Sequence, residues 1–150
     1  MRPRVRQTIV RKSTDVLLAV HPPSGRFHAL LCRGLDSYVM AEFLRQTKDC
    51  FRGDYCIVIC DGAGWHIAGD LKVPNEMHVE LLPAYSPELN PVESVWDYIR
   101  DHDFGNRIFA GLENVEDQLG LSLRELRSTP EVMRSITLFT WIKAAILARR

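Results

Sequence analysis

The sequence lacks the features that would place it in a membrane or on a secretory route. It has no stretch approaching the roughly 18–20 apolar residues of a membrane span. Its basic N-terminus is not followed by a signal-type apolar segment. The 19 basic and 19 acidic residues cancel, so the average charge does not indicate a polyanionic partner. These absences predict a cytoplasmic protein without a membrane partner.

Several motifs of familiar chemistry are also absent. The four cysteines form no C-x-x-C pair, and most lie in or beside apolar runs, which predicts reduced core thiols: Cys32, Cys50, Cys56 and Cys60. The chain has neither the G-x-x-x-x-G-K-[ST] phosphate loop nor the G-x-S-x-G nucleophile elbow. The sequence therefore gives no support for a phosphate-loop enzyme or for serine or cysteine nucleophile chemistry.

What the chain does contain is enough apolar material for one core and an uneven distribution of charge. Its 150 residues are 46% apolar, which suits a single domain. The first twelve residues carry basic side chains and no acidic one: Arg2, Arg4, Arg6, Arg11 and Lys12. Residues 76–103 are rich in acids. We expect a basic edge beside an acidic centre.

The hydrophobic pattern predicts strands in the first two thirds of the chain. Residues 15–20 and 26–32 flank a Pro-Pro-Ser-Gly turn, which is typical of a hairpin. A helix capped by Asp36 or Ser37 should end near Lys48. The continuous apolar run 55–60 is typical of a strand buried on both faces, and residues 77–82 fit another strand of the same sheet.

Helices are predicted for the remainder. Asn90 is a suitable N-cap, Pro91 suits the first helical position, and an apolar stripe follows at helical spacing: Val92, Val95, Trp96 and Ile99. Residues 115–126 fit a second helix. A third should start at a capping box over residues 128–131 and continue through Ile142. The order of elements predicts an α/β fold with mixed strand directions.

Asp61 directly follows the apolar run 55–60. In open α/β sheets, a polar residue at the C-terminal end of a buried strand projects into the crevice where ligands bind. Asp61 can equally be a turn residue that ends the strand. The local sequence leaves both interpretations open.

Glu93 also has two interpretations. It lies three residues after Asn90, so it can be the acid of an Asn-x-x-Glu capping arrangement. Helical geometry also places it beside the apolar stripe, from where its carboxylate can reach toward a strand end. Asp61 and Glu93 together would suit Mg²⁺, which takes a few carboxylates plus water and phosphate oxygens. His66 is expected to hydrogen-bond near Asp61 rather than to coordinate, because hard metals do not favour imidazole.

A longer motif supports the metal-binding interpretation of both acids. Residues 81–96, LLPAYSPELNPVESVW, closely resemble the LPpYSPELNPiE signature of mariner-like DDE transposases. Residues 61–66, DGAGWH, resemble the D-x-x-x-x-H context of the second catalytic Asp in the bacterial insertion sequence 630 branch. By this resemblance, Asp61 and Glu93 match the second and third acids of the DDE triad, with His66 and Asn90 as supporting groups.

The resemblance implies a ribonuclease-H-like fold, a mixed sheet flanked by helices, and dependence on Mg²⁺ or Mn²⁺. One departure concerns the first catalytic Asp, which the family carries on a strand upstream of the segment that Arg2 and Pro3 match. We therefore expect residues 1–150 to be a DDE superfamily endonuclease domain that is partial at its N-terminus and lacks its first strand. Asp15 and Asp36 are the nearest substitutes, but they are expected to open a strand and to cap a helix.

Three functional hypotheses follow. The leading one is a transposase DDE endonuclease domain for metal-dependent cleavage and joining of DNA strands, inactive as this isolated fragment. Its partners would be transposon-end and target DNA, and another copy of the chain or a full-length transposase. The second is a catalytically dead remnant that only binds DNA or forms oligomers. The third is a metal-independent structural domain in which Asp61 is a turn residue and Glu93 a cap.

Overall fold

The computed structural model of the protein describes residues 13–62, 69 and 71–148. His66 and the basic segment 1–12, with Arg2 and Pro3, lie outside the described residues. In chain order the elements are β1 (Asp15–His21), β2 (Arg26–Cys32), α1 (Ser37–Cys50), β3 (Cys56–Cys60), β4 (Met77–Leu81), η2 (Pro87–Leu89), α2 (Pro91–Ile99), η3 (Arg100–Phe104), α3 (Leu112–Ser128), α4 (Pro130–Thr137) and α5 (Thr140–Leu147). No helix in these described ranges is long and apolar enough to cross a bilayer.

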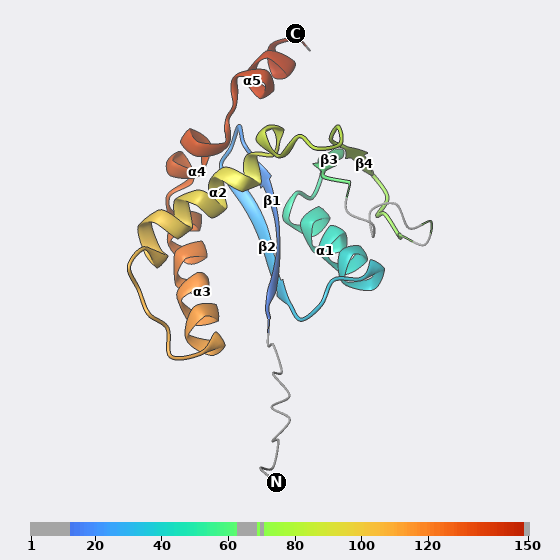
Figure 1. Ribbon diagram of the computed structural model, residues 1–150. Coiled ribbons are helices and arrows are strands. Elements are labelled where there is room, and N and C mark those ends of the chain that lie inside the picture. Colours follow the sequence, from blue (N-terminus) through green and yellow to red (C-terminus); the bar gives the residue numbers. More distant parts are fainter. Residues whose placement is uncertain (1–12, 63–68, 70, 149–150) are drawn as a thin grey trace.

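Strands β1 and β2 form the predicted hairpin. They pair antiparallel, with Leu18 opposite Ala29 and Val20 opposite Phe27. Successive side chains of a strand point to opposite faces of the sheet, and both faces of this hairpin carry apolar residues. The hairpin is therefore covered on both sides, with α1 on one and α2, α3 and α4 on the other (Figure 1).

Two hydrophobic cores lie on the two faces of the hairpin. On one face, Leu17 of β1 joins three residues of α1 and one of β4: Met40, Phe43, Leu44 and Met77. On the other face, Phe27 of β2 joins residues of α2, α3 and α4: Val95, Ile99, Leu123, Leu126 and Met133. Helix α1 therefore packs on both the hairpin and the β3–β4 pair, and links them through one core.

Strands β3 and β4 pair in parallel, with Cys56 opposite Met77 and Cys60 opposite Leu81. The predicted mixture of strand directions is confirmed, and in the described residues it is divided between two two-stranded sheets. The prediction that β3 is buried on both faces was wrong, because Ile57 and Ile59 each remain 46% exposed. Helix α1 covers only the face that carries Cys56 and Val58.

The C-terminal region differs from the single capped helix that the sequence predicts. The hydroxyl of Ser128 donates to the Glu125 carbonyl at 2.7 Å, so it closes α3 and does not cap the next helix. The chain then forms two helices, α4 and α5, because the backbone leaves the helical conformation at Leu138 and Phe139. The predicted capping box and the predicted continuity through Ile142 were both wrong.

The four thiols are free, as expected, but their predicted place in the core is not confirmed. Cys50 is exposed, and Cys32, Cys56 and Cys60 are half-buried. The fully buried apolar positions are taken by larger side chains such as Leu44 and Met133. A larger apolar side chain removes more surface from water than a thiol does.

The tip of the β1–β2 hairpin lies against the start of α4, with no room for a side chain at Gly25. Gly25 has a positive φ of 71°, and a Cβ there would lie 2.1 Å from the Pro130 carbonyl oxygen at the start of α4. We expect Gly25→Ala to lower the free energy of unfolding by about 2–5 kcal/mol, from left-handed strain and overpacking together. Urea denaturation measures this change.

Gly53→Ala is the matched control for Gly25→Ala. Gly53 also has a positive φ, 86°, but a Cβ there would meet no atom within 4 Å. We therefore expect Gly53→Ala to lower the free energy of unfolding by only about 1–2 kcal/mol, the cost of left-handed backbone strain. Equal losses for the two variants would show that the contact between the hairpin tip and α4 contributes nothing.

Candidate active site

Parallel pairing of β3 and β4 determines the surroundings of Asp61. Strand β3 ends at Cys60, and the exposed Asp61 follows directly, as the sequence predicts. Beyond the end of β4, the Leu82 N–H donates to the Cys60 carbonyl at 2.7 Å. This bond extends the pairing by one residue, so the loop that leaves β4 begins beside Asp61.

The start of α2 is organised by Asn90. Its side-chain oxygen accepts a hydrogen bond from the Val92 N–H at 3.1 Å, and Pro91 occupies the first helical position. The predicted N-cap is confirmed. The short helix η2 precedes it, and the Asn90 N–H donates to the Pro87 carbonyl at 2.9 Å. The loop and the helix are thus joined by consecutive backbone and side-chain hydrogen bonds.

Glu93 lies exposed on the first turn of α2, whereas Val95 and Ile99 of the same helix are buried in the core. In a capping box, its carboxylate would accept from the Asn90 N–H. That N–H donates to the Pro87 carbonyl instead. The helix start is therefore satisfied without Glu93. A carboxylate in the first turn is still favoured by the helix dipole.

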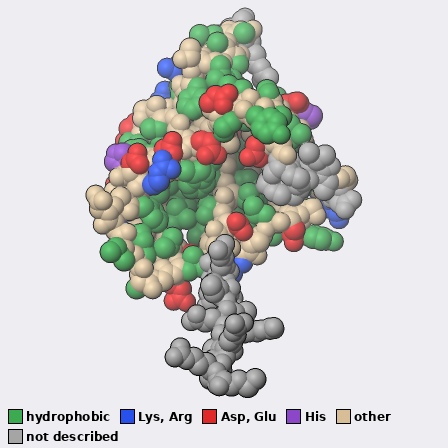
Figure 2. Space-filling view, viewed as in Figure 1, with side chains coloured by type: hydrophobic (Ala, Val, Ile, Leu, Met, Phe, Trp, Pro, Cys, Tyr) green, Lys and Arg blue, Asp and Glu red, His purple; other side chains and the backbone are tan. Residues whose placement is uncertain are grey.

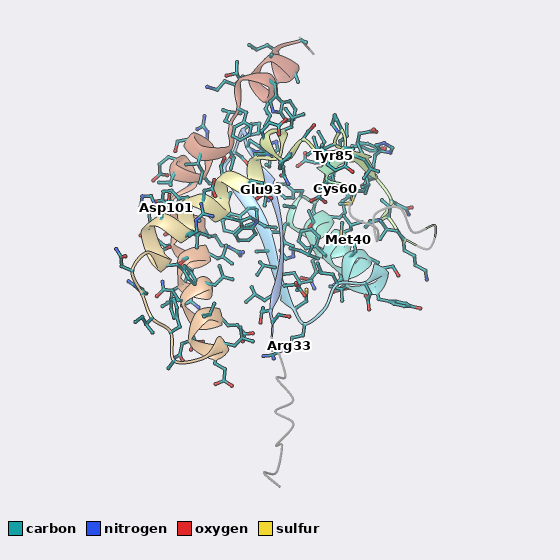
Figure 3. The ribbon with its side chains drawn as sticks, in the orientation of Figure 1. Arg33, Met40, Cys60, Tyr85, Glu93 and Asp101 are labelled. Atoms are coloured by element: carbon teal, nitrogen blue, oxygen red, sulfur yellow. The ribbon has the colours of Figure 1, made fainter. Side chains whose placement is uncertain are left out.

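Asp61 and Glu93 line one pocket of about 440 Å³, although they come from different elements. The β4–α2 loop forms most of its wall, and the described lining residues are Asp61, Gly62, Leu82, Pro83, Ala84, Tyr85, Ser86, Pro87, Asn90 and Glu93. Figure 3 shows Glu93 at the start of α2, and Tyr85 near the end of β3, where Cys60 lies. The fold thus brings together three of the four site residues that the sequence predicts. The fourth, His66, is outside the described residues.

The pocket is acidic. Its described lining contains two carboxylates and no Lys or Arg. Acidic side chains also extend across the middle of the molecular face in Figure 2. Burial, and next the Asp61 charge, raise the pKa of the Cys60 thiol to about 11. Cys60 is therefore a neutral thiol at physiological pH.

The oxygen atoms that line the pocket suit a hard divalent cation, but the described residues bring together only two carboxylates there. Asp61 and Glu93 present carboxylate oxygens of the kind that Mg²⁺ prefers, and the volume leaves room for the waters that Mg²⁺ retains. Within the described ranges, no group of three or more His, Cys, Asp or Glu side chains could hold a metal. Asp15 and Asp36, the nearest substitutes for the first catalytic Asp, bind backbone N–H groups outside this pocket. Asp15 accepts from the Gly34 N–H, and Asp36 caps α1.

Comparison with known proteins identifies the family. Residues 1–116 match the DDE superfamily endonucleases, and these residues include Asp61, Asn90 and Glu93. The chain belongs to this family. It is also 36% identical over 124 residues to the uncharacterized protein y4pE/y4sA of Sinorhizobium fredii, an alignment that covers 82% of this chain and 92% of that one. No solved structure matches it significantly. For this DDE superfamily endonuclease domain, the α/β architecture with small sheets flanked by helices is consistent with a ribonuclease-H-like fold.

Tyr85 was not among the site residues predicted from the sequence, although it is fully exposed and lines the same pocket. Its φ is 58°, in the left-handed region that non-glycine residues seldom occupy. The available signal was its position between two prolines within the motif of residues 81–96. Neither its exposure nor its backbone conformation can be inferred from that position.

The Asn90 side chain is expected to stabilise the start of α2 through its hydrogen bond with the Val92 N–H. We expect Asn90→Ala to lower the free energy of unfolding by about 1 kcal/mol, because the Val92 N–H loses its acceptor. Asn90→Ser keeps a capping oxygen and should retain most of the stability. Thermal unfolding compares the two variants. An unchanged melting temperature for Asn90→Ala would mean that the cap contributes nothing.

Proposed function

We propose that this chain is the catalytic domain, or part of it, of a transposase of the mariner-like superfamily, in the insertion sequence 630 branch. Its reaction would be metal-dependent cleavage and joining of DNA strands. Family membership supports an endonuclease, and the motifs at residues 61–66 and 81–96 favour this branch. The observation that carries the proposal is that Asp61 and Glu93, 32 residues apart in the sequence, line one pocket.

In this proposal, Asp61 and Glu93 hold Mg²⁺ or Mn²⁺ beside the scissile phosphodiester. A bound metal supplies the positive charge that stabilises the attacking and leaving oxygens. The chain itself fixes the ligands: the backbone pairing at Leu82 places the Asp61 end of β3, and the Asn90 cap orients the first turn of α2. Asn90 is assigned a supporting role through this cap, and His66 a hydrogen-bonding role near Asp61.

A third carboxylate would complete the site. In the described residues, β1 pairs only with β2 and β3 only with β4, so each strand keeps an open edge. Open edges present N–H and C=O groups that can pair with another strand. We propose that an additional strand bearing an acid pairs there. The residues that the structure describes would then lack a shared metal ligand, and we expect the 150-residue chain not to cleave DNA.

A non-catalytic role is the second candidate, and one observation favours it. Ile57 and Ile59 leave an apolar face on β3 that no described helix covers. Exposed apolar surface next to an open strand edge favours association with another chain. The protein could then act as a DNA-binding or oligomerisation module that pairs with a complete transposase.

The metal site is tested by titrating Mg²⁺ into the isotopically labelled chain and recording backbone amide shifts. We expect changes confined to the ends of β3 and β4 and the first turn of α2. Asp61→Asn and Glu93→Gln should weaken the response, because each removes a negative oxygen ligand. Asp101→Asn is the matched control, since Asp101 is exposed on η3 and does not line the pocket. An absent response, or one unaffected by Asp61→Asn, would refute metal binding here.

The role of the additional strand is tested by DNA cleavage. The 150-residue chain and a version extended upstream by the strand that bears the third acid are each incubated with Mn²⁺ and transposon-end DNA. We expect cleavage only by the extended protein, since two-metal catalysis needs all of its shared ligands. Cleavage by the unextended chain that Asp61→Ala abolishes would contradict the additional strand and indicate a substitute acid. If the extended protein fails to cleave although it binds Mg²⁺, the non-catalytic candidate is favoured.

A further inference from the structure

Tyr85 combines an unfavourable backbone conformation with complete exposure of its ring. Its φ of 58° lies in the left-handed region, where the Cβ of an L-residue crowds the following carbonyl. Its accessible surface is 101% of the reference value, so packing of the ring does not compensate for the strain. Strained residues of this kind cluster at functional sites, where the surrounding structure holds them in place.

The surroundings of Tyr85 hold its backbone in this position. Pro83 and Pro87 restrict the chain on either side, because proline fixes its own φ. The Leu82 N–H donates to the end of β3, and the Leu89 N–H donates to the Ser86 carbonyl at 3.1 Å. Hydrogen bonds therefore fix the loop backbone before and after Tyr85, while the ring projects into solvent at the wall of the pocket.

The charge of the pocket determines what the ring can bind. Two carboxylates and no described Lys or Arg line the wall, so the protein surface does not attract a phosphate backbone at this place. An aromatic face binds a nucleobase by stacking, which does not depend on charge and tolerates any base. Other tyrosines are placed differently: Tyr98 stacks on His102 with ring centroids 3.9 Å apart, and Tyr38 is exposed on α1 away from this pocket.

We propose that Tyr85 is a stacking platform for an unpaired nucleobase of the DNA strand that enters the pocket. This inference rests on the proposed function, since it takes DNA as the ligand of the pocket. Stacking next to Asp61 and Glu93 would hold an unpaired nucleotide beside the phosphodiester that is cleaved. Tyr85 would then position the strand, and the carboxylates would carry the metal chemistry.

The test uses the full 150-residue chain and a single DNA strand of about ten nucleotides, within the range of simple single-strand binding sites. The strand carries 2-aminopurine, whose fluorescence falls when it stacks. Binding is measured with and without Mg²⁺ for the wild type, Tyr85→Phe and Tyr85→Asn. Asn tolerates a positive φ, so the second variant removes the ring and retains the loop. Tyr38→Asn is the matched control, because it removes an exposed tyrosine outside the pocket.

We expect Tyr85→Asn to weaken binding by about fivefold to a hundredfold and to abolish the quenching. Tyr85→Phe and Tyr38→Asn should behave as the wild type. Equal affinity for Tyr85→Asn and Tyr38→Asn, no quenching by the wild type, or a loss in Tyr85→Phe as large as in Tyr85→Asn would each overturn the stacking proposal.

Asp61→Asn separates this proposal from the proposed function. Loss of the Mg²⁺-dependent part of the affinity in Asp61→Asn supports the metal site, whatever the result at Tyr85. If binding depends on the ring but not on Mg²⁺ or Asp61, the stacking platform stands and the metal site fails. If binding depends on Mg²⁺ and Asp61 but not on the ring, the metal site stands and the stacking platform fails.

Discussion

Apolar burial on both faces of the β1–β2 hairpin is the interaction on which the rest of the structure depends. Leu17 packs toward α1, whereas Leu18 and Phe27 pack toward α2, α3 and α4. Each fully buried side chain of this size contributes about 1.5–3 kcal/mol. Because α1 also packs on β4 through Met77, the same interaction holds the β3–β4 pair beside the helices.

The pocket is a consequence of this arrangement. Parallel pairing brings the ends of β3 and β4 to the same edge, and the short connection through η2 to Asn90 starts α2 close to that edge. The two carboxylates are thereby placed on backbone that hydrogen bonds hold in position, while their side chains remain exposed. In the proposed function, a cation would bind these exposed carboxylates from water without the cost of first burying an isolated charge.

Much of the local structure could be predicted from the sequence because its signals act over a few residues. The hairpin, the Asp36 cap and the Asn90 cap all depend on neighbouring side chains and backbone groups. One local prediction still failed, the capping box at residues 128–131, because the Ser128 hydroxyl donates to the Glu125 carbonyl. The other failures depend on distant contacts. Burial of Ile57 requires a second covering layer, and the break at Leu138 occurs within an apolar pattern that suits a continuous helix.

The sequence by itself determined the chemistry that the protein can offer: two acids of hard-ligand type, at a strand end and on a capped helix, within motifs typical of DDE endonucleases. Only the tertiary structure decided that Asp61 and Glu93 share a pocket, and that Tyr85 stands exposed at its wall. The reason is physical. Residue type and local hydrogen bonding are encoded within a few positions, whereas the meeting of a strand end with a helix start depends on how α1 and the hairpin pack together.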